Sequence, residues 1–224
     1  MTHNWTIIVA GGAGTRMGAE VPKQFITLGD TPIIVHTLNA FHRADPDMGL
    51  VVVLPEAHLE TWSKICKTHA VPEHKITRGG ATRFDSVAAG LAAIPQDATL
   101  VGVHDGVRPF ASKELIYRCF EQADRCGSAI PVVPAVDSFR QICEDGTSKV
   151  VDRSALRAVQ TPQVFRAELL RRAYTECAGG SGFTDDASVV EALGESVCLV
   201  EGERFNIKIT TPEDLLIGRA LIKN

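Results

Sequence analysis

The chain has 224 residues, a length that suits one α/β domain spanning residues 1–224. Apolar residues make up 45% of the sequence and charged residues 22%, which is ordinary globular usage and excludes disordered and fibrous proteins. The formal net charge of −4 argues against nucleic acid as a partner, and the lack of a long uncharged apolar run argues against a membrane, so we expect a cytoplasmic protein.

Short runs rich in Val and Ile alternate with helix-length amphipathic segments along most of the chain. This alternation is typical of parallel strands covered by helices, so it predicts an α/β, Rossmann-like fold with a mostly parallel sheet. We expect strands at residues 5–10, 50–54, 74–77, 99–103, 128–133 and 197–200. We expect helices at residues 31–44, 56–69, 82–94, 112–125, 166–177, 185–192 and 212–222.

The stretch from about residue 134 to 163 does not follow this alternation. Two β-like pieces, at residues 137–143 and 149–152, flank a turn at Glu144-Asp145-Gly146, which predicts a protruding β-hairpin arm. Because a two-stranded ribbon is only marginally stable alone, we expect the arm to pack on a second copy of the chain in a homodimer.

A glycine-rich segment follows the first predicted strand directly. Glycines let several backbone N–H groups converge on phosphate oxygens, and the carboxyl end of a strand is where α/β sheets bind ligands. A merely tight turn between strand and helix is the alternative. We take the nucleotide-binding residues of this segment to be Ala10, Gly11, Gly12 and Gly14.

Two common phosphate-binding motifs do not fit this segment. The P-loop pattern GxxxxGK followed by Ser or Thr is absent. The dinucleotide pattern GxGxxG is nearly met by Gly12-Ala13-Gly14, but the next glycine, Gly18, comes one residue late, and Pro22 would break a helix that opened there. A dehydrogenase is therefore a remote alternative.

Two cations, Arg16 and Lys23, flank the glycine-rich segment. In nucleotidyl transfer, negative charge builds on the α-phosphate and on the leaving pyrophosphate, so fixed cations lower the barrier. Solvated surface side chains are the ordinary alternative for Lys and Arg. We predict both residues to be catalytic, with Lys23 also binding the nucleotide.

The pattern Ala-Gly-Gly-x-Gly-x-Arg-Met-Gly followed by Pro-Lys-Gln-Phe, at residues 10–25, resembles the opening of the sugar nucleotidyltransferases. The Pro-Lys-Gln-Phe form is similar to one branch, the cytidylyltransferases acting on 2-C-methyl-D-erythritol 4-phosphate or ribitol 5-phosphate. The resemblance runs nearly end to end. It implies CTP and a sugar-alcohol phosphate as substrates, pyrophosphate as a product and a divalent cation, Mg²⁺, as cofactor.

A second motif, at residues 78–87, ends one predicted strand and opens a helix, so its free N–H groups can face an anion or a base edge. It resembles the Gly-Gly-x-x-Arg-x-x-Ser element of the branch. The alternative is a capped helix start with an arginine on the surface. The resemblance assigns nucleotide contacts to Gly80, Ala81, Arg83 and Ser86.

A third motif places Asp105 at the carboxyl end of a strand. Mg²⁺ prefers one or two carboxylates together with phosphate oxygens, so one aspartate suffices for a metal that arrives with the nucleotide. The motif resembles the His-Asp-x-x-Arg-Pro element of the branch, which makes Asp105 a metal ligand, Gly106 a nucleotide contact, and Asp105 and Arg108 substrate contacts. His104 is expected to be a buried, hydrogen-bonded histidine.

The remaining site residues rest on the resemblance. Ser138 and Arg153 lie in segments similar to the arm that family members exchange across a dimer, so Arg153 would reach the site of the partner subunit. Thr184, in Thr-Asp-x-Ala-Ser, and Lys208, in Asn-Ile-Lys-Ile-Thr, would lie at the acceptor, and Lys208 would hold its phosphate. Residues 151–156 look more like the methylerythritol branch than the ribitol branch.

These residues predict in-line attack by a phosphate oxygen of the acceptor on the α-phosphorus of CTP. The nucleophile is already ionised, so no general base is required. The predicted catalytic residues are four cations, Arg16, Lys23, Arg153 and Lys208. Ribitol 5-phosphate remains the alternative acceptor, and a nucleotide-binding regulator without activity is a more remote reading.

Overall fold

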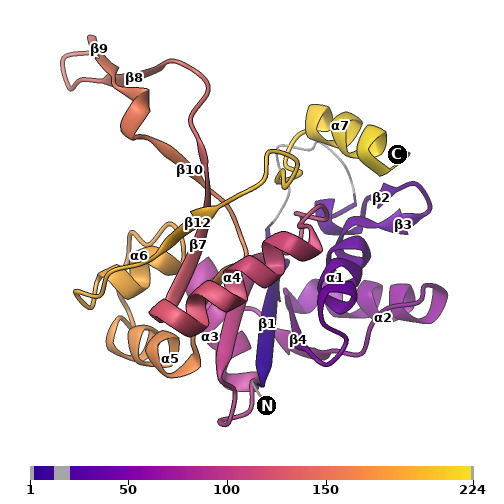
Figure 1. Cartoon of the computed structure of the whole chain (residues 1–224). Helices are drawn as coiled ribbons and strands as arrows, with labels where there is room; N and C mark the ends of the chain where they lie inside the picture. Colours follow the sequence, from indigo (N-terminus) through magenta and orange to yellow (C-terminus); the bar gives the residue numbers. More distant parts are fainter. Residues whose placement is uncertain (1–2, 13–20, 223–224) are drawn as a thin grey trace.

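The computed structural model describes residues 3–12 and 21–222 (Figure 1). Its main element is an eight-stranded sheet in the order β10-β7-β11-β6-β1-β4-β5, with β12 paired to β7. The strands are β1 (Asn4–Val9), β4 (Gly49–Leu54), β5 (Lys75–Arg78), β6 (Leu100–Asp105), β7 (Ser128–Pro134), β10 (Arg157–Val159), β11 (Gln163–Arg166) and β12 (Leu199–Glu201).

Helices cover both faces of this sheet. The α-helices are α1 (Ile33–Ala44), α2 (Leu59–Thr68), α3 (Arg83–Ala93), α4 (Lys113–Cys126), α5 (Ala167–Glu176), α6 (Asp186–Glu191) and α7 (Pro212–Ile222). Apolar side chains of α1, α2 and α4 form a core with one face of the sheet, and those of α3, α5 and α6 form a core with the other.

Alternation of side chains along β1 and β4 explains why these strands are apolar throughout. Ile8 and Val52 contribute to the core under α1, whereas Ile7 and Val51 contribute to the core under α3. A strand buried on both faces has no polar side, which is the mark of a parallel sheet between two helical layers. The predicted α/β, mostly parallel sheet flanked by helices is confirmed.

The sheet contains antiparallel strands that were not predicted. β11 lies between β6 and β7 and runs antiparallel to both, and β10 pairs antiparallel with the outer part of β7. The other contacts in the sheet, β1 with β4 and β6, β4 with β5, and β7 with β12, are parallel. The chain thus returns from the arm by two short strands before α5 begins.

The predicted hairpin is present in the structure. β8 (Phe139–Ile142) and β9 (Ser148–Val151) pair antiparallel, and Gly146 in their turn has φ 79°, a left-handed conformation that glycine adopts without strain. A short helical turn, η4 (Arg153–Ala155), follows β9. Figure 1 shows these elements projecting from the body of the molecule, joined to it by β7 and β10.

A smaller layer completes the fold near α7. The two-residue strands β2 (Thr27–Leu28) and β3 (Thr31–Pro32) pair after the turn η2 (Lys23–Phe25), and a second such turn, η3 (Glu56–His58), precedes α2. Leu28, Ile33, Val107 and Ile209 form a third apolar cluster beneath α7. Among the described helices, none combines the length and the apolarity needed to cross a membrane.

Candidate active site

A cleft opens at the carboxyl ends of β1, β5 and β6, on the edge of the sheet where the sequence motifs were expected to meet. We call it the main cleft. Three segments that are far apart in the sequence form most of its wall, and the C-terminal region adds one lysine. The lining residues are Val9, Ala10, Gly11, Gly12, Lys23, Gln24, Gly80, Ala81, Thr82, Arg83, Ser86, Asp105, Val107 and Lys208.

One wall of the main cleft is formed by the end of β1 and the turn η2. The side-chain amide of Gln24, fully buried, donates a 2.9 Å hydrogen bond to the carbonyl of Ala10 and lies 3.1 Å from His58 Nδ1. A Cβ on Gly12 would lie 3.3 Å from Lys23 Nζ, so glycine lets the backbone approach the ammonium closely. This wall brings Lys23 next to Gly12, where the described part of the glycine-rich segment ends.

The opposite wall is the N-terminus of α3. Thr82 caps the helix by accepting a hydrogen bond from the Asp85 N–H, and Asp85 in return accepts from the Thr82 N–H. A Cβ on Gly80 would lie 2.2 Å from Asp85 Cβ, so this capping arrangement requires glycine there. Ser86 Oγ donates to the carbonyl of Thr82 at 2.9 Å. The capped end turns free N–H groups and the positive end of the helix dipole toward the cleft.

Asp105 lies at the centre of the site, at the end of β6. Arg108 Nε donates to Oδ2 at 3.0 Å, and Lys208 Nζ donates to Oδ1 at 3.1 Å. Burial alone would raise the pKa of this carboxyl, but the Lys208 ammonium and the Arg108 guanidinium bring its pKa well below its usual range. Asp105 is therefore a carboxylate at neutral pH and a poor proton acceptor.

His104 lies behind Asp105 and is fully buried and hydrogen-bonded, as predicted. Burial lowers its pKa to about 4, so the ring is neutral at pH 7. Nε2 lies 3.0 Å from the carbonyl of Arg108, which can only accept, so Nε2 carries the proton. Nδ1 then accepts from Thr161 Oγ1 at 3.0 Å, and Oγ1 accepts from the Asp105 N–H at 3.1 Å. This chain of hydrogen bonds fixes the turn from Asp105 to Arg108.

A second cavity adjoins the main cleft, and we call it the side pocket. Both cavities are lined by Arg83, Asp105 and Lys208, so these three side chains stand at the junction between them. Two of the predicted acceptor contacts, Arg108 and Thr184, line the side pocket. Its remaining lining residues are Val159, Gln160, Thr161, Gln163 and Asp185.

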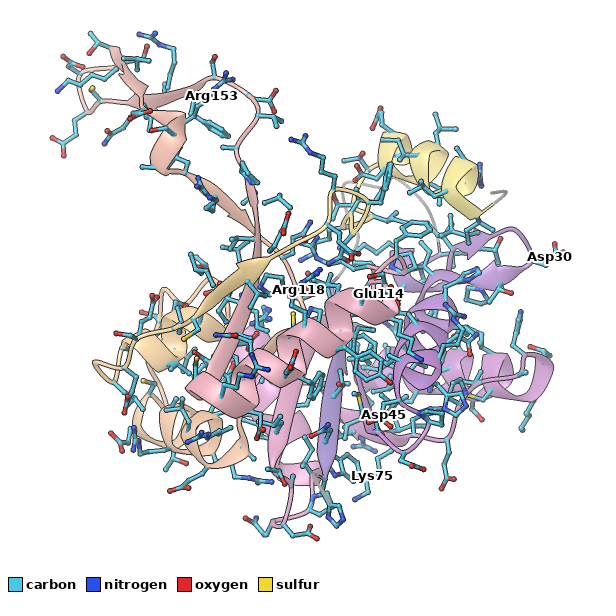
Figure 2. The ribbon with its side chains drawn as sticks, in the orientation of Figure 1. Asp30, Asp45, Lys75, Glu114, Arg118 and Arg153 are labelled. Atoms are coloured by element: carbon cyan, nitrogen blue, oxygen red, sulfur yellow. The ribbon has the colours of Figure 1, made fainter. Side chains whose placement is uncertain are left out.

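The structure does not bring every predicted residue to the two cavities. Ser138 and Arg153 lie on the arm and are exposed. Figure 2 shows Arg153 there, and its guanidinium donates to the carbonyl of Val136. Gly106 lies beside the main cleft, where its N–H donates to the carbonyl of Val9. Arg16 and Gly14 lie outside the described residues.

Sequence reasoning missed several polar residues that shape the site. The fully buried side chain of Asn206 donates from Nδ2 to the backbone carbonyl of Thr161 at 2.8 Å. The backbone carbonyl of Asn206 accepts from Arg108 Nη1 at 2.8 Å. Gln24 stood inside the Pro-Lys-Gln-Phe motif without an assigned role, and no role was assigned to Thr161. Gln24 and Asn206 each stand beside a phenylalanine and near an isoleucine, which indicates a polar side chain drawn into the interior, where it needs a hydrogen-bonding partner. Thr161 carries no such local signal.

Within the described ranges, no group of three or more His, Cys, Asp or Glu side chains could hold a metal ion by itself. Asp105 can still serve as a single ligand. Each carboxylate oxygen accepts one hydrogen bond from a cation and retains further lone-pair capacity. One carboxylate is enough for Mg²⁺ where phosphate oxygens and water supply the other ligands.

Comparison with known proteins gave consistent results along the whole chain. Residues 5–224 match the family described as IspD, 2-C-methyl-D-erythritol 4-phosphate cytidylyltransferase. A protein of that name from Bacteroides fragilis is 51% identical over 217 residues, covering 96% of this chain and 98% of the relative.

Solved structures agree with this result. The 4-diphosphocytidyl-2C-methyl-D-erythritol synthase of Anaerococcus prevotii superposes with a TM-score of 0.85 at 29% identity, covering 100% of this chain and 97% of the other. A 2-C-methyl-D-erythritol 4-phosphate cytidylyltransferase from Thermus thermophilus gives a TM-score of 0.78 at 36% identity, with both chains fully covered.

Proposed function

Since the chain belongs to the 2-C-methyl-D-erythritol 4-phosphate cytidylyltransferase family, we propose that CTP and its acceptor react at the junction of the main cleft and the side pocket. The enzyme is a nucleotidyltransferase. It transfers a cytidylyl group from CTP to 2-C-methyl-D-erythritol 4-phosphate, giving 4-diphosphocytidyl-2-C-methyl-D-erythritol and pyrophosphate. The observation that carries the placement is that Asp105, Lys208 and Arg83 line both cavities.

The nucleotide occupies the main cleft in this proposal. Gly11, Gly12 and the capped end of α3 supply N–H groups and a positive dipole for phosphates and base edges. Lys23 lies on the same wall as Gly12 and would stabilise the negative charge that develops on the transferring phosphate. Arg16 would act with Lys23 there, on the strength of its place in the sequence motif.

The acceptor occupies the side pocket. Thr184 would contact its hydroxyl groups, and Lys208, at the junction, would hold its phosphate against the α-phosphorus of CTP. The attacking oxygen belongs to a phosphate that is already ionised, so the reaction needs no proton acceptor. This agrees with the site, where the pKa of Asp105 lies well below its usual range and the buried His104 faces Thr161 instead of the cleft.

We propose Mg²⁺ as the cofactor, held by Asp105 together with the phosphates of CTP. When bound, the ion would supply positive charge to the triphosphate and its leaving pyrophosphate. Asp105 suits this role because Arg108 and Lys208 keep it ionised and fix its orientation. We also propose a cytoplasmic location, which the six free cysteines of the chain support.

Release of pyrophosphate tests the proposed function. The purified protein should release pyrophosphate from CTP when 2-C-methyl-D-erythritol 4-phosphate is added, and far less with ribitol 5-phosphate. Preference for ribitol 5-phosphate would overturn the proposed acceptor. CTP binding without turnover on either acceptor would instead indicate a regulator.

We further propose a homodimer in which the arm of one subunit reaches the site of the other. Apolar side chains on the arm are exposed, among them Ile142 at 71% and Val150 at 78%, so none of the described parts of the chain covers this surface. Arg153, on the same arm, lies apart from the main cleft of its own chain (Figure 2). A second subunit would cover the apolar residues and receive Arg153 at its acceptor.

Complementation between two impaired variants tests this exchange. Arg153→Met and Lys208→Met should each retain only a small residual activity alone. In a mixed dimer, one site combines an intact Lys208 with an intact Arg153 from the partner subunit, so mixing under exchange should restore about a quarter of full activity. No recovery in mixtures that form mixed dimers would refute the exchange.

A further inference from the structure

Arg83 is held at the junction of the two cavities by an aspartate that sequence analysis did not single out. Arg83 Nη1 and Nη2 donate to Asp186 Oδ1 and Oδ2 at 3.0 and 2.6 Å, a two-point contact that fixes both the position and the plane of the guanidinium. The Arg83 side chain is 30% exposed, whereas that of Asp186 is fully buried. The cation therefore faces the cavities, and its anchor lies beneath it.

Asp186 is itself fixed from two further directions. Tyr174 donates its hydroxyl to Asp186 Oδ1 at 2.6 Å, from helix α5. The fully buried Gln163 accepts the N–H groups of Asp186 and Ala187 at 3.0 and 2.9 Å, from strand β11. Helices α3 and α5 thus converge on the carboxylate, and β11 holds the backbone that carries it, which leaves little freedom for the arginine that Asp186 holds.

Gln163 also connects this network to the side pocket. Its amide Nε2 donates to Asp185 Oδ2 at 2.8 Å, and Asp185 caps α6 directly after Thr184, the expected acceptor contact. One group of hydrogen bonds therefore sets both Arg83 and the segment that carries Thr184.

The pairing leaves Arg83 able to bind anions. Two of its N–H groups point to Asp186, and a guanidinium carries more donors than these two. Burial alone would lower the pKa of Arg83, but the Asp186 carboxylate raises its pKa above the ordinary value, so the side chain is always charged. A charged, rigid donor at the junction can contact both phosphorylated substrates.

We propose that Asp186 is a positioning residue of the reaction, which holds the Arg83 guanidinium at the junction so that it binds anionic groups of both the nucleotide and the acceptor phosphate. This inference rests on the proposed function of the site. It differs from a purely structural ion pair between α3 and α6, which would affect stability but not substrate binding.

Steady-state kinetics of Asp186→Asn, Arg83→Met and the double variant test the proposal. With Arg83 no longer held, Asp186→Asn should lower kcat/KM by roughly a hundredfold, a size that small misplacements of catalytic groups can produce. KM should rise for both CTP and the acceptor. Because Asp186 acts through Arg83, the double variant should be no worse than Arg83→Met alone.

Arg171→Met is the matched control. Arg171 joins α5 to the far end of α3 by donating to the carbonyls of Leu91, Ile94 and Pro95, at 3.1, 3.1 and 2.9 Å. Its loss should weaken the packing of α3 against α5, and so lower stability, but leave both KM values within about twofold of the unsubstituted enzyme. Asp186→Asn kinetics that match those of Arg171→Met at equal loss of stability would refute the positioning role.

A milder variant keeps the test decisive if Asp186→Asn does not fold. Tyr174→Phe removes only the hydroxyl that donates to Asp186, and it should raise KM for both substrates by roughly two- to tenfold. Unchanged KM values would again contradict the proposal.

Failure of the proposed function is distinguishable, because the unsubstituted protein would then release no pyrophosphate. In that case, equilibrium titration with CTP still tests whether Asp186→Asn weakens nucleotide binding. Equal affinity of Asp186→Asn and the unsubstituted protein for CTP would refute the inference.

Discussion

The neutral state of His104 has a measurable cost for stability at mildly acidic pH. The pKa of His104 is about 4 in the folded protein, against 6.5 as its ordinary value. Between these two values the unfolded chain binds a proton that the folded protein does not. The stabilisation is therefore fully present above pH 6.5 and is lost as the pH falls toward 4.

The size of the effect follows from the two pKa values. The full loss, reached once the pH has fallen below the folded pKa, is about 3 kcal/mol, because a tenfold change in proton affinity corresponds to about 1.4 kcal/mol. At about pH 5, well above the folded pKa, the expected loss relative to about pH 7.5 is roughly 2 kcal/mol. This amounts to a sizeable fraction of the stability of an ordinary domain.

Urea unfolding at the two pH values measures this loss. His104→Gln, which cannot take up a proton, should be less stable than the unsubstituted protein at about pH 7.5. It should lose roughly 2 kcal/mol less on acidification, because the titrating group is gone while the carboxylates remain. Protein concentration is held constant, since assembly also shifts apparent stability. If both proteins lost the same free energy, the buried, neutral His104 could not be linked to acid sensitivity.

Three further outcomes follow from the site. Lys208→Met removes a fixed cation that we expect to stabilise the transition state by about 3 kcal/mol, so kcat/KM for pyrophosphate release should fall roughly a hundredfold. A decrease of less than about threefold would contradict the role assigned to Lys208. Thr161→Val removes the hydroxyl that partners the Asp105 N–H and His104 Nδ1, so it should lower the free energy of unfolding by about 1–3 kcal/mol in urea titrations. Thr161→Ser keeps a hydroxyl and should retain most of the stability. Equal losses in the two variants would refute the role of the hydroxyl. Treatment with EDTA should abolish turnover and added Mg²⁺ should restore it, while full activity in EDTA would exclude the proposed cofactor.

Much of the fold could be predicted because local patterns and packing agree. The strands that are buried on both faces, such as β1 and β4, gave continuous apolar runs, and the amphipathic helices between them gave clear periods. β11 was missed because four residues between Pro162 and a helix start carry too little pattern. Its antiparallel position between β6 and β7 is decided by tertiary pairing, which no local signal encodes.

In the site, too, local patterns predicted some residues, while others depend on contacts between segments far apart in the sequence. The carboxyl end of a strand indicated Asp105, and the glycines indicated the main cleft, since both depend on local geometry. The contact between Asp105 and Lys208 joins residues 103 positions apart, and only resemblance to a family had indicated Lys208. Asp186 was missed because an acid in the first turn of a helix is ordinary, and its contact with Arg83 is equally remote in sequence.

The separation of Asp105 from Lys208 also orders events during synthesis. The ribosome makes β6 and its aspartate while the lysine, 103 residues later, has not yet been made. Until the segment after β12 arrives, Arg108 is the nearby cation that can offset the acid. The centre thus cannot form until Lys208 has been translated, which comes after every described strand of the sheet.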